Sequence, residues 1–166
     1  MFGISTLGWL HTLGSLPAIP AAAYMIFRYG GIRPRSRAGR VYFVCMVIGS
    51  LTIFLIAKAP VSPVIAFVTL ACVIGGYAVH RLTFLGRIEK YAETLLLSLS
   101  VFLLMVPTVS ETLRRVPDGH PIVADPNSII LKIAIGAIAL MFVLGLATQF
   151  FYLARFGDKA ARNGDT

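Results

Sequence analysis

The stretch Phe27-Arg28-Tyr29-Gly30-Gly31-Ile32-Arg33-Pro34-Arg35-Ser36-Arg37-Ala38-Gly39-Arg40-Val41-Tyr42 decides how this chain folds. It contains five arginines and no acidic residue, and it lies between two long apolar runs. A short basic loop between apolar helices stays on the cytoplasmic side of a membrane. The stretch therefore predicts the direction of every helix that follows it.

The composition of the chain is that of a membrane protein. Hydrophobic residues make up 57% of its 166 residues, charged residues only 13%, and the mean hydropathy is +0.83. Soluble domains carry about 25% charged residues, which they need to cover a surface that faces water. The net charge of +8 does not indicate nucleic acid as a partner, because the basic residues cluster at the ends of apolar runs. There each one gains about 1 kcal/mol from anionic lipid headgroups.

Five apolar runs are each long enough to cross a hydrocarbon core of about 30 Å. They predict an all-α integral membrane bundle with transmembrane helices at about 3–27, 41–59, 63–84, 90–113 and 128–152. Pro17 and Pro20 lie inside the first run and predict a kink near its middle. Residues 1–154 form one transmembrane domain in this prediction, and residues 155–166 form a short polar cytoplasmic tail.

The distribution of basic residues predicts the orientation of the bundle. With the loop that carries Arg28, Arg33, Arg35, Arg37 and Arg40 inside, the inner side holds eleven basic residues and the outer side three. Lys132, the fifteenth, lies within the last run. This bias predicts an N-terminus outside, a C-terminus inside and insertion in a bacterial inner membrane. The five arginines are thus expected to set topology and to anchor the protein to anionic headgroups.

A second group of polar residues is expected on the outer side. Its members are His11, Glu111, Asp118, His120, Asp125 and Lys132. Histidine and carboxylates are ligands of divalent metals, but the spacing matches no metal motif, and Arg114 and Arg115 offer ordinary pairing to the acids. His11 is open to two interpretations, a ligand or proton-relay group and a hydrogen bond between helices. The sequence therefore predicts no metal and no cofactor at this group.

Two residues on the inner side have simple expected roles. His80 ends the third run, where contact with headgroups is expected. Glu93 begins the fourth run and is expected to pair with Arg81, Arg87 or Lys90. Haem ligation by His11 and His80 together is excluded, because these residues lie near opposite faces, at levels separated by roughly 24 Å of helix rise.

Three short motifs resemble a family of small bacterial inner-membrane proteins that is known only as a domain of unknown function. They are Leu10-His11-Thr12-Leu13-Gly14, Arg35-Ser36-Arg37-Ala38-Gly39-Arg40-Val41-Tyr42 and Asp118-Gly119-His120-Pro121. Members of the family often read His-Arg-x-x-Gly-Arg-x-Tyr at the second motif, where this chain has Arg35 and Ser36. The resemblance implies the fold and the membrane location, and it brings no activity with it.

The sequence predicts function only in outline. It contains no P-loop, dinucleotide fingerprint, zinc-protease helix or nucleophile motif. We expect a non-enzymatic protein that binds or assembles with membrane components, including anionic lipids, a second copy of itself or another membrane protein. The alternative is a small transporter in which His11, Glu111 and Lys132 line an outer vestibule. A third hypothesis is a membrane-embedded redox or lipid-modifying enzyme, which would need a cofactor or a catalytic group that the sequence does not reveal.

Overall fold

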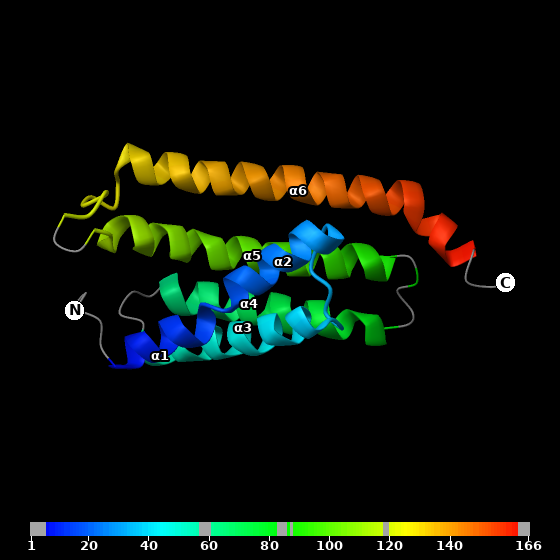
Figure 1. Ribbon diagram of the computed structural model, residues 1–166, viewed down its shortest axis with the longest axis horizontal. Coiled ribbons are helices and arrows are strands. Elements are labelled where there is room, and N and C mark those ends of the chain that lie inside the picture. Colours follow the sequence, from blue (N-terminus) through cyan, green and yellow to red (C-terminus); the bar gives the residue numbers. More distant parts are fainter. Residues whose placement is uncertain (1–5, 57–60, 83–85, 87, 118–119, 163–166) are drawn as a thin grey trace.

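A computed structural model describes residues 6–56, 61–82, 86, 88–117 and 120–162 of the chain, and this part of it is helical (Figure 1). The helices are α1 (Thr6–Ser15), α2 (Ala18–Tyr29), α3 (Arg37–Ile56), α4 (Val61–Ala78), the 3₁₀ turn η1 (Val79–Arg81), α5 (Ile88–Arg115) and α6 (Ile129–Arg162). Within the described residues, five helical segments are long and apolar enough to cross a membrane: Thr6–Tyr29, Arg37–Ile56, Ser62–Arg81, Ile88–Arg115 and Ile129–Arg155. The predicted number of long apolar helices is confirmed.

The first segment is broken, as its prolines predict. Helix α1 ends at Ser15 and α2 begins at Ala18, so that Leu16 and Pro17 form the break. Pro17 and Pro20 lack the N–H groups that would bond to carbonyls four residues earlier, so the helical ladder is interrupted there. Figure 1 shows α2 leaving the axis of α1 and crossing the bundle obliquely.

Three helix boundaries differ clearly from the predicted ones. Helix α4 ends at Ala78 and gives way to the 3₁₀ turn η1, and Leu82 is no longer helical, although the predicted helix ran to residue 84. Helix α3 begins at Arg37 and not at about Val41, because the polar residues ahead of the apolar run are already helical. Helix α6 continues to Arg162, through most of the residues that were predicted to form a separate polar tail. Apolar periodicity locates the buried part of a helix, and polar residues can extend that helix without changing the apolar pattern.

The core of the bundle lies between α2, α3 and α4. Its buried side chains are those of Ala18, Ala22, Met25, Tyr42, Met46 and Val73. Small residues bring the backbones of the neighbouring helices together. A Cβ atom at Gly49 of α3 would lie 2.9 Å from the Cβ of Ser15, and one at Gly76 of α4 would lie 2.5 Å from Leu97 of α5. Close approach through glycine is a common way for membrane helices to associate.

Helix α6 is attached to the bundle mainly through α5. One side chain of α6 also contacts a segment beyond α5. Gln149 accepts a hydrogen bond from Ser98 of α5 (2.8 Å) and donates one to the carbonyl oxygen of Gly30 after α2 (3.0 Å). The amide thus ties three spans together near one end of the bundle.

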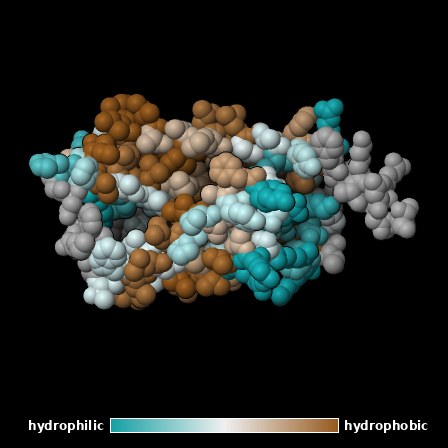
Figure 2. All heavy atoms as spheres, in the orientation of Figure 1, coloured by the Kyte–Doolittle hydropathy of each residue, from teal (hydrophilic) through white to brown (hydrophobic). Residues whose placement is uncertain are grey.

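The sides and the ends of the bundle differ in polarity. Figure 2 shows hydrophobic residues along α6, whereas hydrophilic residues gather where the loop between α2 and α3 lies. Large apolar side chains on the sides are exposed, among them Phe27 (91%), Leu55 (70%) and Ile129 (67%). In water such a surface would be unstable, whereas in a bilayer it is solvated by acyl chains.

Candidate functional site

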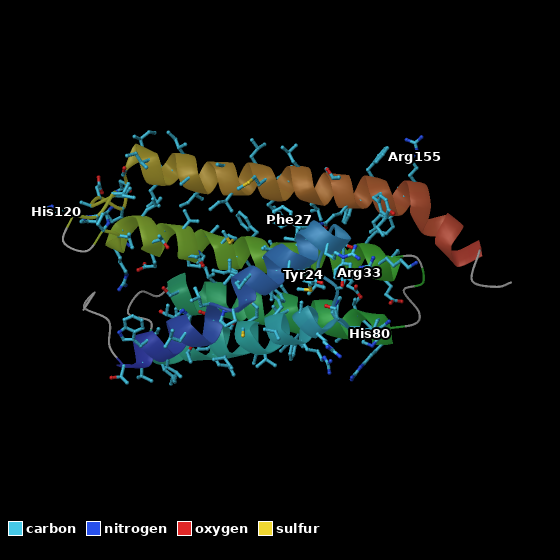
Figure 3. All side chains as sticks on the ribbon, in the orientation of Figure 1. Tyr24, Phe27, Arg33, His80, His120 and Arg155 are labelled. Carbon is cyan, nitrogen blue, oxygen red and sulfur yellow. The ribbon has the colours of Figure 1, made fainter. Side chains whose placement is uncertain are left out.

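Most of the described basic residues lie at one end of the bundle, which we call the basic end. Here α2 and α4 finish, and α3 and α5 begin (Figure 1). The basic residues of this end include Arg28, Arg33, Arg35, Arg37, Arg40, Arg81, Lys90 and Arg155. Figure 3 places Arg33, His80 and Arg155 toward this end and His120 at the opposite one. The five loop arginines that were predicted to act together therefore do lie at one end.

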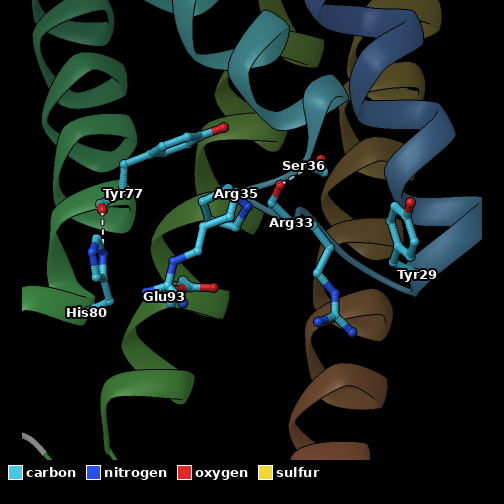
Figure 4. Close-up of a pocket in the computed structure, with 8 residues that line it drawn as sticks. Tyr29, Arg33, Arg35, Ser36, Tyr77, His80 and Glu93 are labelled. Carbon is cyan, nitrogen blue, oxygen red and sulfur yellow. Dashed lines mark hydrogen bonds between the residues drawn. The ribbon is translucent and has the colours of Figure 1, made fainter.

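The basic end contains an open pocket of about 580 Å³. Four segments that are distant in sequence line it: the end of α2, the loop between α2 and α3, the end of α4 with η1, and the second turn of α5 (Figure 4). The lining residues are Tyr29, Arg33, Pro34, Arg35, Ser36, Tyr77, His80 and Glu93. The volume falls in the range of small-molecule sites, roughly 300–1,000 Å³.

The loop that carries the two arginines of the pocket is fixed at both of its ends. Gly30 adopts a left-handed conformation (φ 75°), and its N–H donates to the carbonyl of Ile26 (2.8 Å), which ends α2. Ser36 then caps α3, because its hydroxyl oxygen accepts a hydrogen bond from the N–H of Gly39 (2.9 Å). The same hydroxyl donates to the carbonyl of Arg33 (2.9 Å). Arg33 and Arg35 therefore project from a backbone of defined geometry.

Gly39 brings this loop against the first turn of α3. A Cβ atom at this position would overlap the carbonyl oxygen of Arg33 and would lie 2.7 Å from that of Pro34. The carbonyl of Gly39 also accepts a hydrogen bond from the hydroxyl of Tyr77 on α4 (2.6 Å). A single glycine thus joins the loop, α3 and α4 behind the pocket.

The opposite wall of the pocket is held by α4 and η1. His80 donates from Nδ1 to the carbonyl of Tyr77 (2.9 Å), as Figure 4 shows. Because a carbonyl can only accept, Nδ1 carries a proton, and Nε2 is an acceptor in the tautomer of the neutral ring that this bond selects. The ring is half-buried. His80 thus contributes to the pocket as well as lying at the end of its helix.

Glu93 supplies the negative charge of the pocket. Its half-buried carboxyl group lies within electrostatic reach of Arg35, His80 and Arg33, and of Glu89 with the same sign. Figure 4 shows the side chain of Arg35 directed toward it. The sequence suggested Arg81, Arg87 or Lys90 as its partner. Arg87 lies outside the described residues. Within them, the charged groups around Glu93 come mainly from the loop and from η1, which lie near the start of α5.

His11, the first of the predicted outer residues, is engaged with a neighbouring helix. Its Nδ1 lies 2.8 Å from the hydroxyl oxygen of Thr52 and 3.1 Å from the carbonyl oxygen of Gly49, both on α3. The Thr52 hydroxyl donates its own hydrogen to the carbonyl of Ile48 (2.8 Å), so it accepts from the histidine. His11 therefore makes the hydrogen bond between helices that was one of its two expected roles.

Replacing His11 with alanine should cost about 1 kcal/mol of unfolding free energy, because hydrogen bonds between membrane helices average roughly 0.6 kcal/mol and reach about 1.7. Thermal unfolding of the purified protein in detergent measures this. The exposed His120 provides the control, and His120→Ala should leave the transition unchanged. If the two variants were equally stable, the bond to α3 would contribute nothing measurable.

The other predicted outer residues have separate partners. Glu111 forms an ion pair with Arg115 (2.6 Å) and a longer one with Arg114 (3.8 Å) on its own helix. Asp125 accepts a hydrogen bond from the N–H of Asn127 (2.8 Å) in the loop before α6. Lys132 and His120 are exposed, and Asp118 lies outside the described residues. Within the described part of the chain, no three histidine, cysteine or acidic side chains form a group that could hold a metal ion.

Sequence reasoning assigned the basic loop to orientation and anchoring, and it missed the pocket. Arg33, Arg35, His80 and Glu93 were each predicted to lie on the inner side, which was the one signal available. That signal does not give the direction of the side chains. No protein-family model, curated protein or solved structure matches this chain, so its membership of the family set out above stays a prediction.

Proposed function

We propose that this chain is a multi-pass protein of the bacterial inner membrane that binds anionic headgroups of the cytoplasmic leaflet and catalyses no reaction. In this proposal its N-terminus is outside and its C-terminus inside. The observation that carries the proposal is the gathering of arginines around an open pocket at one end of a bundle with apolar sides.

Electrostatics supports this assignment of ends. The opposite end has two described arginines, Arg114 and Arg115, and both are paired with Glu111. Among the residues of the basic end whose side chains the structure describes, the arginines outnumber the two acids, Glu89 and Glu93. Anionic lipids of the cytoplasmic leaflet attract such a surface by about 1 kcal/mol per basic residue. Retention of the basic end on the cytoplasmic side and binding of anionic lipid then have a single cause.

Aromatic residues also suit this placement. Tyr24, Phe27 and Tyr29 are exposed on α2 close to the loop. Arg28 and Arg33 each lie over the Tyr29 ring, with Cζ 5.8 Å from its centroid. Aromatic rings gather at the headgroup level of membrane proteins, and arginine can interact with a ring and a phosphate together.

Reporter fusions and lipid analysis test the proposal. A fluorescent protein fused after residue 166 should be bright, and alkaline phosphatase inserted between α5 and α6 should be active. Lipid extracted with the protein should be enriched in anionic species, and the enrichment should fall in high salt because screening weakens surface charges. An active phosphatase at the C-terminus would refute the orientation, and a lipid shell with the composition of the bulk membrane would refute the binding.

A further inference from the structure

The pocket at the basic end holds an excess of hydrogen-bond donors. The guanidinium groups of Arg33 and Arg35 have five N–H donors each. Figure 4 draws no hydrogen bond from either group to another residue that lines the pocket. Arg33 lies beside Tyr29, and Arg35 extends toward Glu93. One carboxylate faces two guanidinium groups, so the pocket carries a net positive charge before any charge on His80 is counted.

Phosphate is an anion whose several oxygens can engage both of these guanidinium groups. Guanidinium presents its N–H groups as a planar fork that matches two phosphate oxygens at once. Figure 4 shows the two side chains directed apart, Arg33 beside Tyr29 and Arg35 toward Glu93, so they must turn toward each other to contact different oxygens of the same phosphate. The backbone between them is held by Ser36 and by the close contact at Gly39, so binding a ligand has to order the two side chains but not the loop backbone.

A bare phosphate, however, sets its oxygens against two acceptors of the pocket. Glu93 would face a second negative charge, and Nε2 of His80 would face an acceptor. Both groups are satisfied if the ligand also has a hydroxyl or ammonium group next to its phosphate. Unpaired acceptors inside a site cost affinity, so the pair discriminates between ligands with and without such a donor.

The surface beside the pocket favours a ligand with an acyl chain. Tyr29 lines the pocket, and its ring contacts that of Tyr24 edge-on, with centroids 6.1 Å apart. Phe27, which is 91% exposed, lies on the same helix (Figure 3). Exposed aromatic side chains thus lie on α2 next to the pocket, at the end of the apolar segment Thr6–Tyr29.

We propose that this pocket binds one phosphate ester whose alcohol part carries a hydroxyl or ammonium group. Arg33 and Arg35 contact the phosphate, and Glu93 and His80 accept hydrogen bonds from the substituent. The headgroup of a glycerophospholipid has this chemistry, and so does a soluble phosphate ester of glycerol. The choice of a lipid rests on the function proposed above, whereas the phosphate chemistry rests on the pocket alone.

Native mass spectrometry of the full chain in detergent tests the proposal, with phosphatidylglycerol and phosphatidic acid as probes. The two lipids share the phosphate, but only the first has hydroxyl groups beyond it. We expect one phosphatidylglycerol per chain, bound about tenfold more tightly than phosphatidic acid. Glycerol phosphate is titrated in parallel. If it binds as tightly as phosphatidylglycerol, the ligand is a soluble ester, and if none of the probes binds one to one, the proposal is wrong.

Variants locate the site. The double variant R33Q/R35Q should bind phosphatidylglycerol roughly 10–100-fold more weakly, and the matched variant R114Q/R115Q at the opposite end should bind it normally. The variant R33K/R35K keeps the two positive charges but loses the planar guanidinium groups. Its affinity for phosphatidylglycerol should lie between those of the other two variants. It replaces R33Q/R35Q in the test if that variant does not fold. Equal losses in the loop variant and in its matched control would overturn the assignment.

A substitution of Glu93 distinguishes binding in a specific pocket from general attraction to a positively charged surface. Glu93→Gln should weaken phosphatidylglycerol binding and strengthen phosphatidic acid binding, because it replaces the charged acceptor of the hydroxyl by a weaker, neutral amide oxygen and removes a charge that repels phosphate. Similar gains for both lipids would show attraction by charge alone and would refute the role of Glu93. Failure here is distinct from failure of the proposed function, because binding in detergent does not depend on orientation in the membrane.

Discussion

Replacing Gly39 with alanine should lower the free energy of unfolding by about 2–3 kcal/mol, the range of an overpacked interior. The added methyl group would overlap the backbone carbonyl of Arg33 and press on that of Pro34. A backbone group cannot rotate away as the end of a side chain can, so the loop must move off the first turn of α3. The hydrogen bond from Tyr77 to the Gly39 carbonyl would be disturbed as well. Chemical or thermal unfolding in detergent measures the loss.

Gly145 offers a matched control for this substitution. It lies in α6, and a Cβ atom there would have no atom of the described residues within 4 Å. Gly145→Ala should therefore be neutral, or stabilising by up to about 1 kcal/mol from the better helix propensity of alanine. The expected order of stability is Gly145→Ala, then wild type, then Gly39→Ala. If both variants unfolded with the wild type, the loop would not be packed on α3 as the structure shows.

The second large effect concerns orientation. The quadruple variant R33Q/R35Q/R37Q/R40Q should insert as a mixture of both orientations, because the first basic loop usually dominates the topology of a multi-pass protein. A C-terminal fluorescent fusion should then lose a large share of its signal. A C-terminal alkaline phosphatase fusion should gain activity by a similar proportion. The remaining basic residues of the same end would keep some molecules in the original orientation.

The control for the quadruple variant is a double variant of the two arginines at the opposite end of the bundle. R114Q/R115Q removes two positive charges from the side that we propose to be outside, so the bias toward the original orientation increases and the C-terminal fusion should stay bright. Immunoblots of both variants correct the signals for the amount of protein. A quadruple variant as bright as the wild type would mean that the later basic residues, and not this loop, determine orientation.

The long helices could be predicted from sequence because each is an apolar run of sufficient length. The break in the first segment was equally predictable, since Pro17 and Pro20 remove specific hydrogen bonds. The ends of α3 and α6 were not. Ser36 caps α3 ahead of the apolar residues, and the polar end of α6 stays helical without any apolar stripe to reveal it.

The candidate site was less predictable, for a reason that Glu93 illustrates. Hydropathy gives the level of a residue along the bundle, but not its rotation about the helix axis or the neighbour that it meets. The sequence placed Glu93 on the inner side and suggested basic residues close to it in the chain. Its electrostatic neighbours from the loop, Arg33 and Arg35, are more than fifty positions away in the sequence. Only the packing of α2, α3 and α5 brings Glu93 close to these two arginines.

The order in which the helices pack has a consequence for biogenesis. Helices α1 and α2 both pack on α3, α3 packs on α4, α4 on α5 and α5 on α6. Each apolar segment thus finds its main partner in the segment made just before it. A nascent chain can assemble stepwise during translation, without waiting for a distant helix to emerge from the ribosome, and local contacts of this kind favour fast folding. The late bond from Gln149 to the Gly30 carbonyl would then close the assembly, once α6 has been synthesised.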